Sequence, residues 1–156
     1  MGFSYEDWEV GSRLEVGAHT FTAEEIVEFA EQFDPQPFHV DEAAAQASPF
    51  GGLIASGWHT CSVMMGMLVR NVLPGSTSLG SPGIEEIRWV RPVRAGDTLR
   101  MFNSVLAKRV SASRPDRGIV TTLWEGLNQA DETVITVRSN VLFGLRRPGA
   151  EGGASA

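Results

Sequence analysis

Cysteine is nearly absent from this 156-residue chain, in which Cys61 is the only one. A single cysteine excludes an internal disulfide, and it excludes zinc sites built from several thiolates. Basic residues are also scarce, since 13 Lys and Arg stand against 19 Asp and Glu and the net charge is −6. This balance argues against nucleic acid as a partner, because phosphate binding requires a basic face.

Long apolar runs are missing as well. No segment approaches the roughly 20 apolar residues that a membrane helix needs, and the opening residues 1–10 lack the basic start and apolar centre of a signal peptide. We therefore expect no membrane association and a cytoplasmic location. The length fits one domain, which we place at residues 1–147. The Gly/Ala/Ser-rich segment 148–156 is expected to be a disordered tail.

The first elements expected along the chain are a strand and an amphipathic helix. Residues 13–20 are predicted to form the strand. Thr22 and Glu25 have the spacing of a capping box and open the helix. The helix ends near Phe33. Pro35 and Pro37 each move the preceding residue out of the helical region, so we expect residues 34–38 to be stiff, extended and non-helical.

Two more helical segments are expected before the strands begin. Residues 41–47 form a short helical turn, and a longer helix spans about residues 56–73. Apolar side chains cover most of the longer helix, which is typical of a buried helix. Its expected apolar stripe consists of Trp58, Cys61, Met65, Leu68 and Val72, and Met64 and Val69 widen it.

The rest of the chain predicts antiparallel strands. They are expected at residues 84–90, 98–107, 119–127 and 133–143, with a hairpin loop over 128–132. A single sheet that has to cover one apolar helix will curl around it. The result is an α+β layer architecture, of which the hotdog fold is the best-known form.

Residues 33–39 carry the candidate catalytic pair. Asp34 and His39 stand five residues apart and are joined through two prolines, which restrict the linking backbone. A carboxylate and an imidazole held together bind one water molecule, so that one group accepts its proton and the other delivers a proton elsewhere. The alternative is that Asp34 is a turn residue after a helix and His39 a packed loop histidine.

Residues 51–60 lead into the longer helix. The free N–H groups at its start, near Gly57 and Trp58, are candidates to bond an acyl carbonyl oxygen. Glycines there let a ligand approach the backbone, although a loop that needs glycine only to turn would look the same. Trp58 and the methionines at 64, 65 and 67 line an acyl tunnel or, as we favour, belong to the core.

Three arginines and two further histidines are weaker candidates for functional residues. Arg88, Arg91 and Arg94 would either meet the phosphates of coenzyme A or form a solvated strand face, and we favour the solvated face. His59 is a weaker candidate for the site because it lies within a turn of Gly57. His19 has no visible partner and is expected at a strand end.

Three segments together resemble the MaoC-like family, the (R)-specific enoyl-CoA hydratases. Asp34-Pro35-Gln36-Pro37-Phe38-His39 is similar to the family's hydratase motif, which reads Asp, any residue, Asn, Pro, an apolar residue, His. Residues 53–58 look like the entry to its central helix, and residues 87–99 resemble its Arg-aromatic, Pro-Val and Gly-Asp strand and turn. The resemblance covers residues 10–144. Gln36 replaces the motif's Asn, and Ser56 replaces the His that many members have before the glycine.

The resemblance implies a hotdog fold and the reversible hydration of a trans-2-enoyl-CoA to a (3R)-hydroxyacyl-CoA. Asp34 and His39 would be catalytic, and the substrate would be bound by Gln36, Ser56, Gly57 and Trp58. It also implies a homodimer or an assembly of dimers. No metal or redox cofactor is implied, since coenzyme A enters as part of the substrate.

Two other functions stay open at this point. The same fold hosts thioesterases, which release the free thiol by attack on the thioester carbonyl. A non-catalytic module that binds acyl-CoA or acyl carrier protein is the third possibility, and the departures at Gln36 and Ser56 motivate it.

Overall fold

The computed structural model describes residues 2–147, so the expected tail at 148–156 lies outside the described residues. The helical elements are η1 (Tyr5–Asp7), α1 (Ala23–Phe33), α2 (Pro37–Val40), α3 (Glu42–Ala47) and α4 (Gly57–Asn71). The strands are β1 (Arg13–Thr20), β2 (Gly83–Trp89), β3 (Thr98–Val110), β4 (Arg117–Leu127) and β5 (Thr133–Gly144). The predicted order of elements is confirmed. Within residues 2–147, no helix has the length and apolar character to cross a membrane.

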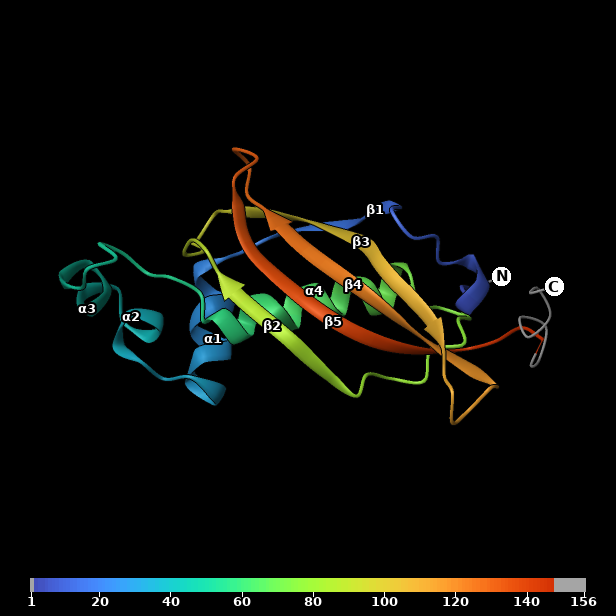
Figure 1. Cartoon of the computed structure of the whole chain (residues 1–156). Helices are drawn as coiled ribbons and strands as arrows, with labels where there is room; N and C mark the ends of the chain where they lie inside the picture. The colour runs from blue at the N-terminus through green and yellow to red at the C-terminus, as the bar shows by residue number, and fades with distance from the viewer. Residues whose placement is uncertain (1, 148–156) are drawn as a thin grey trace.

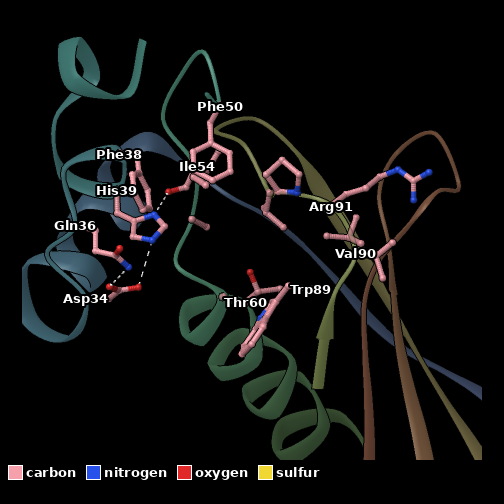
Figure 2. Close-up of a pocket in the computed structure, with 15 residues that line it drawn as sticks. Asp34, Gln36, Phe38, His39, Phe50, Ile54, Thr60, Trp89, Val90 and Arg91 are labelled. Atoms are coloured by element: carbon pink, nitrogen blue, oxygen red, sulfur yellow. Dashed lines mark hydrogen bonds and ion pairs between the residues drawn. The ribbon is translucent and has the colours of Figure 1, made fainter. Parts of the chain in front are cut away.

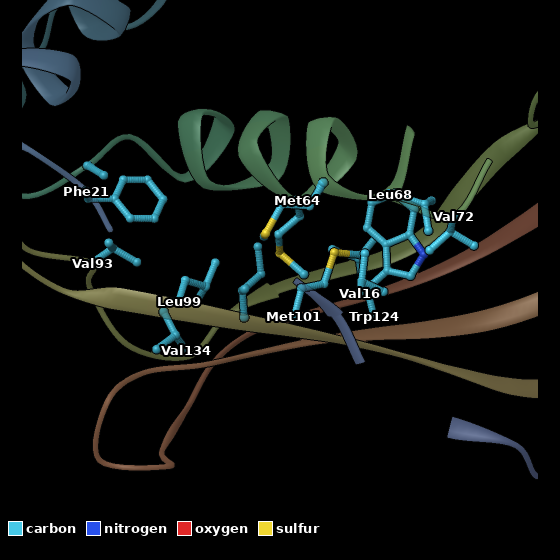
Figure 3. Close-up of a cluster of buried hydrophobic side chains, with 14 of the residues drawn as sticks. Val16, Phe21, Met64, Leu68, Val72, Val93, Leu99, Met101, Trp124 and Val134 are labelled. Atoms are coloured by element: carbon cyan, nitrogen blue, oxygen red, sulfur yellow. The ribbon is translucent and has the colours of Figure 1, made fainter. Parts of the chain in front are cut away.

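The five strands form one antiparallel sheet in the order β1-β3-β4-β5-β2. Figure 1 shows the sheet curving along α4, with α1, α2 and α3 gathered near the N-terminal end of that helix. Apolar side chains fill the space between α4 and the sheet (Figure 3), among them Phe21, Met64, Leu99, Met101 and Trp124. The predicted α+β hotdog architecture is therefore confirmed.

α1 begins and ends where its local signals lie. The Thr22 hydroxyl accepts a hydrogen bond from the Glu25 N–H at 3.1 Å, which satisfies one of the amides that the first helical turn leaves unpaired. The helix stops at Phe33, and Asp34 has non-helical dihedral angles of φ −154° and ψ 67°. Because Pro35 follows directly, the helix cannot run through this point. Asp34 is thereby placed at the end of α1.

The expectation that residues 34–38 are extended is wrong beyond Gln36. α2 starts at Pro37, so Phe38 and His39 belong to a short helix. Proline is tolerated at the first helical position, where its missing N–H has no partner to lose. Its restriction falls only on Gln36, which is extended with φ −72° and ψ 143°. The helical turn puts His39 on the same side of the chain as Asp34.

The expectation that α4 is a buried helix is only partly right, and so is its predicted apolar stripe. Leu68 and Val72 are buried, but Trp58 and Met65 are 56% and 43% exposed. The buried side chains of the helix are His59, Thr60, Met64, Met67 and Leu68. Apolar residues occupy two faces of α4, and their periodicity does not say which face meets the sheet. Packing leaves an apolar strip on the outside of the helix.

Candidate active site

Asp34 and His39 meet where α1 gives way to α2 (Figure 2). Asp34 Oδ2 lies 3.3 Å from His39 Nε2. The His39 side chain is 6% exposed and the Asp34 side chain 18% exposed, so both groups are largely withdrawn from bulk water. The structure thus brings together the two side chains that the sequence marks as a catalytic pair.

The backbone of a distant segment sets the orientation of His39. Its Nδ1 lies 2.7 Å from the Ile54 carbonyl oxygen. A carbonyl oxygen only accepts hydrogen bonds, so Nδ1 carries a proton. The other ring nitrogen, Nε2, faces Asp34 Oδ2, and the two groups are placed to hold a proton or a water molecule between them.

Two further donors hold the Asp34 carboxylate. Ser56 Oγ donates to Oδ2 at 2.7 Å, and Gln36 Nε2 donates to Oδ1 at 2.8 Å. Burial raises the pKa of Asp34, but the hydrogen bonds from Ser56 and Gln36 and the interaction with His39 outweigh it and hold the pKa below its ordinary value. Asp34 is therefore ionised at neutral pH. The two departures from the family motif, at positions 36 and 56, both act on this one carboxylate.

The start of α4 lies beside the pair. Gly57 is the first residue of the helix, and its N–H finds no hydrogen-bond acceptor within residues 2–147, as is normal in a first helical turn. A Cβ atom at Gly57 would lie 2.4 Å from Trp89 Nε1. A side chain at this position would therefore displace the indole ring that packs on it. Gly57 offers a free backbone donor, with the Trp89 ring packed against its Cα.

These groups open into a pocket of about 340 Å³, which is within the range of small-molecule sites. The rest of the pocket wall is mostly apolar. It runs from α2 to the end of β2 and the residues directly after β2. The lining residues are Asp34, Gln36, Phe38, His39, Phe50, Ile54, Ala55, Gly57, Thr60, Trp89, Val90, Arg91, Pro92, Val93 and Val134. A polar pair at one end and an apolar wall beyond it suit a ligand with one reactive polar group on a short apolar chain.

Two residues expected to bind substrate lie outside this lining. Ser56 is completely buried and contacts Asp34 instead. Trp58 packs edge-on against Trp89, with 5.4 Å between ring centroids, on the exposed side of α4. Of the three arginines, Arg91 lines the pocket and donates to the Thr133 carbonyl oxygen at 2.8 Å. Arg88 pairs with Glu86 on the surface, which agrees with the solvated strand face that we favoured.

His59 and His19 share a carboxylate away from the pocket lining. Glu25 Oε1 lies 2.5 Å from His19 Nε2 and 3.6 Å from His59 Nε2, so the expectation that His19 has no partner is wrong. His59 also stacks on Phe29, with 4.7 Å between ring centroids. Burial lowers the pKa of His59, opposed by the charge of Glu25 and reinforced by His19. Within residues 2–147, no group of three or more His, Cys, Asp and Glu side chains has the arrangement of a metal site.

Sequence reasoning missed much of the pocket wall, most notably Trp89. Within β2 this tryptophan looked like one apolar residue in an alternating strand. Its place over Gly57 depends on how β2 packs beside α4, and no local pattern encodes that packing. Phe50 and Thr60 were missed for the same reason, since one lies in a loop and the other looked like an ordinary helical residue.

The fold and the carboxylate–imidazole site define a hotdog-fold protein with the machinery for proton transfer. Residues 9–125 match the family model described as "MaoC like domain". This match spans most of the chain, so the chain belongs to the MaoC-like family.

Individual relatives support this assignment. The crystal structure of the MaoC-like dehydratase from Rhodospirillum rubrum is 44% identical with a TM-score of 0.86, and the alignment covers 94% of this chain and 99% of that one. The R-hydratase PhaJ1 from Pseudomonas aeruginosa is 25% identical with a TM-score of 0.74, covering 99% and 96%. The uncharacterized protein YdeM of Bacillus subtilis is 28% identical over 88% of this chain and 96% of its own length.

Proposed function

We propose that this chain is an acyl-thioester hydro-lyase that reversibly hydrates a trans-2-enoyl-CoA to a (3R)-hydroxyacyl-CoA in the cytoplasm. The observation that carries the proposal is the geometry of Asp34 and His39. The carboxylate of Asp34 and the imidazole of His39 face each other at 3.3 Å at the polar end of an apolar pocket. Membership in a family that includes dehydratases, and similarity to an R-hydratase, support the same reaction class.

The pair activates water by accepting both of its hydrogen bonds. One proton of the water points at Asp34 and the other at His39 Nε2, which turns the oxygen lone pair toward the β-carbon of the enoyl group. As the carbon–oxygen bond forms, Asp34 takes up a proton. His39 Nε2, 3.3 Å away, takes this proton from Asp34 and delivers it to the α-carbon, while the second proton of the water stays on the new hydroxyl group. The elements of one water molecule are thereby added across the double bond. The lowered pKa of Asp34 keeps its carboxylate ionised, and so able to accept a proton, at neutral pH.

The thioester carbonyl is the second point of contact. Attack at the β-carbon moves negative charge onto the carbonyl oxygen, and a donor aimed at that oxygen stabilises the enolate. The free N–H of Gly57, at the positive end of α4, supplies this donor. Because the conjugated carbonyl activates the alkene and the site provides the base, the acid and the donor, the reaction needs no metal or redox cofactor.

The active molecule is a homodimer. β2 is an edge strand that pairs only with β5 in the described sheet, and an unpaired edge is a ready place for a second chain. Large apolar side chains that are 43–56% exposed gather on β2, the residue after it and the outer face of α4, namely Trp58, Met65, Val69, Ile84, Trp89 and Val90. Patches of this kind mark protein interfaces, and this one borders the pocket through Trp89 and Val90.

The test uses purified protein and crotonyl-CoA. The ultraviolet absorbance of the conjugated thioester is followed in one cuvette, and a thiol reagent reports free coenzyme A in a parallel one. Loss of conjugation without free thiol is expected. Release of thiol would overturn the hydro-lyase assignment in favour of a thioesterase. Saturable binding with no turnover, across short, branched and longer enoyl thioesters, would point instead to a non-catalytic acyl-binding module.

A further inference from the structure

The Ser56 hydroxyl lies between the two halves of the site. It donates to Asp34 Oδ2 at 2.7 Å and accepts a hydrogen bond from the Trp58 N–H at 3.3 Å. Ser56 is completely buried, and it does not line the pocket. A substrate in that pocket therefore meets Asp34 and Gly57 but not the serine between them.

Residues 54–57 position or supply the groups that the proposed reaction uses. The carbonyl oxygen of Ile54 orients His39, the hydroxyl of Ser56 holds Asp34, and Gly57 follows with its free N–H. This segment is held to the chain between β2 and β3, because the Ala55 N–H donates a hydrogen bond to the Val93 carbonyl oxygen at 2.8 Å. The carboxylate at the end of α1 is thus tied to the start of α4 through a single side chain.

We propose that Ser56 is a positioning residue for hydration, whose hydroxyl fixes the Asp34 carboxylate against the start of α4 as an ionised acceptor directed at the bound water. This role rests on the proposed hydration and adds a residue to it. The hydroxyl is one of the hydrogen-bond donors that hold the pKa of Asp34 below its ordinary value. It also prevents rotation of the carboxylate, since Gln36 holds the other oxygen.

If Ser56 were only a helix cap, its removal would destabilise α4 without changing the ionisation of Asp34. Ser56 is the N-cap of α4, and removing any N-cap hydroxyl weakens its helix. Thr22 is a matched control, because its hydroxyl caps α1 through the Glu25 N–H at 3.1 Å and has no contact with Asp34 in the described structure. Thr22→Ala therefore removes a comparable cap and leaves the carboxylate untouched.

The kinetic experiment compares Ser56→Ala with Thr22→Ala. Thr22→Ala is expected to lower Tm by about 2–4 °C, and Ser56→Ala by at least as much, because it also removes the hydrogen bond to Asp34. Ser56→Ala alone should lower kcat about tenfold, the rate equivalent of one lost hydrogen bond to a charged group, with KM nearly unchanged. Its acidic limb in the pH–rate profile should move to higher pH, because the carboxylate has lost a donor. Ser56→Gly, which removes the hydroxyl at less cost to the helix start, should show the same shift.

A second readout needs no turnover. Carboxyl ¹³C NMR of the labelled protein follows the ionisation of Asp34 in the absence of substrate, and the signal is assigned by its loss in Asp34→Asn. The Asp34 signal should titrate at higher pH in Ser56→Ala than in the wild type, and it should not move in Thr22→Ala. If both variants titrate as the wild type does, Ser56 is only a helix cap and the proposal falls. If the titration moves but the wild type does not hydrate enoyl thioesters, the contact stands and the proposed function falls.

Discussion

Gly57→Ala tests the close packing of β2 on the start of α4. The added Cβ would lie 2.4 Å from Trp89 Nε1, 2.5 Å from Cε2 and 2.9 Å from Cδ1. Contacts this short do not occur, so the indole ring has to move. The Trp89 residue is 47% exposed, which allows the ring to swing outward without disrupting the core between α4 and the sheet.

The freedom of the Trp89 ring to move limits the expected loss of stability. Overpacking a rigid core lowers the free energy of unfolding by about 1–3 kcal/mol. Because the half-exposed Trp89 ring can move, Gly57→Ala should lower it by only about 1–2 kcal/mol. Alanine is otherwise the better helix former by up to about 1 kcal/mol. In a Trp89→Ala background the same change should therefore be neutral or stabilising.

The assay is a double-mutant cycle in urea, with the hydration rate measured in parallel. Gly83→Ala is the control, because a Cβ at Gly83 would meet nothing within 4 Å, and its unfolding free energy should change by less than about 0.5 kcal/mol. Hydration by Gly57→Ala should fall, since the displaced Trp89 ring forms part of the pocket wall beside the proposed carbonyl donor. An equal stability cost of Gly57→Ala with and without Trp89 would refute the argument from packing.

Three further predictions concern catalysis, pH and assembly. Asp34→Asn and His39→Ala should each lower kcat by about 10²–10⁴ while circular dichroism shows an intact fold, and full activity in either folded variant would rule out the mechanism. The pKa of His59 is lowered in the folded chain, mainly by burial, so below pH about 6.5 the unfolded chain binds more protons and stability falls with falling pH. Thermal melts between pH 7.5 and pH 5 should show this loss, and His59→Gln should reduce it; an unchanged pH dependence would contradict the role of His59. Light scattering at micromolar concentration should give a dimer, and Val69→Arg on the outer face of α4 should give a monomer; a monomeric wild type would count against the proposed interface.

The sequence by itself determined the features that depend on neighbouring residues. The hydroxyl of Thr22 and the proline at 35 set the two ends of α1, and alternation of apolar side chains identified the strands. The spacing of Asp34 and His39 across two prolines marked them as a candidate pair, although a helical turn at Pro37, and not the extended link that we expected, brings them together. These signals act within a few residues, where backbone sterics and capping bonds leave few alternatives.

Tertiary structure alone decided the features that join distant segments. Ile54 orients His39 across 15 residues and Ser56 holds Asp34 across 22, while Trp89 covers Gly57 from another strand. Which apolar face of α4 is buried was equally open, because both faces satisfy the helical period. Such contacts depend on how whole elements pack, and packing is set by the shape of the complete core rather than by any local pattern.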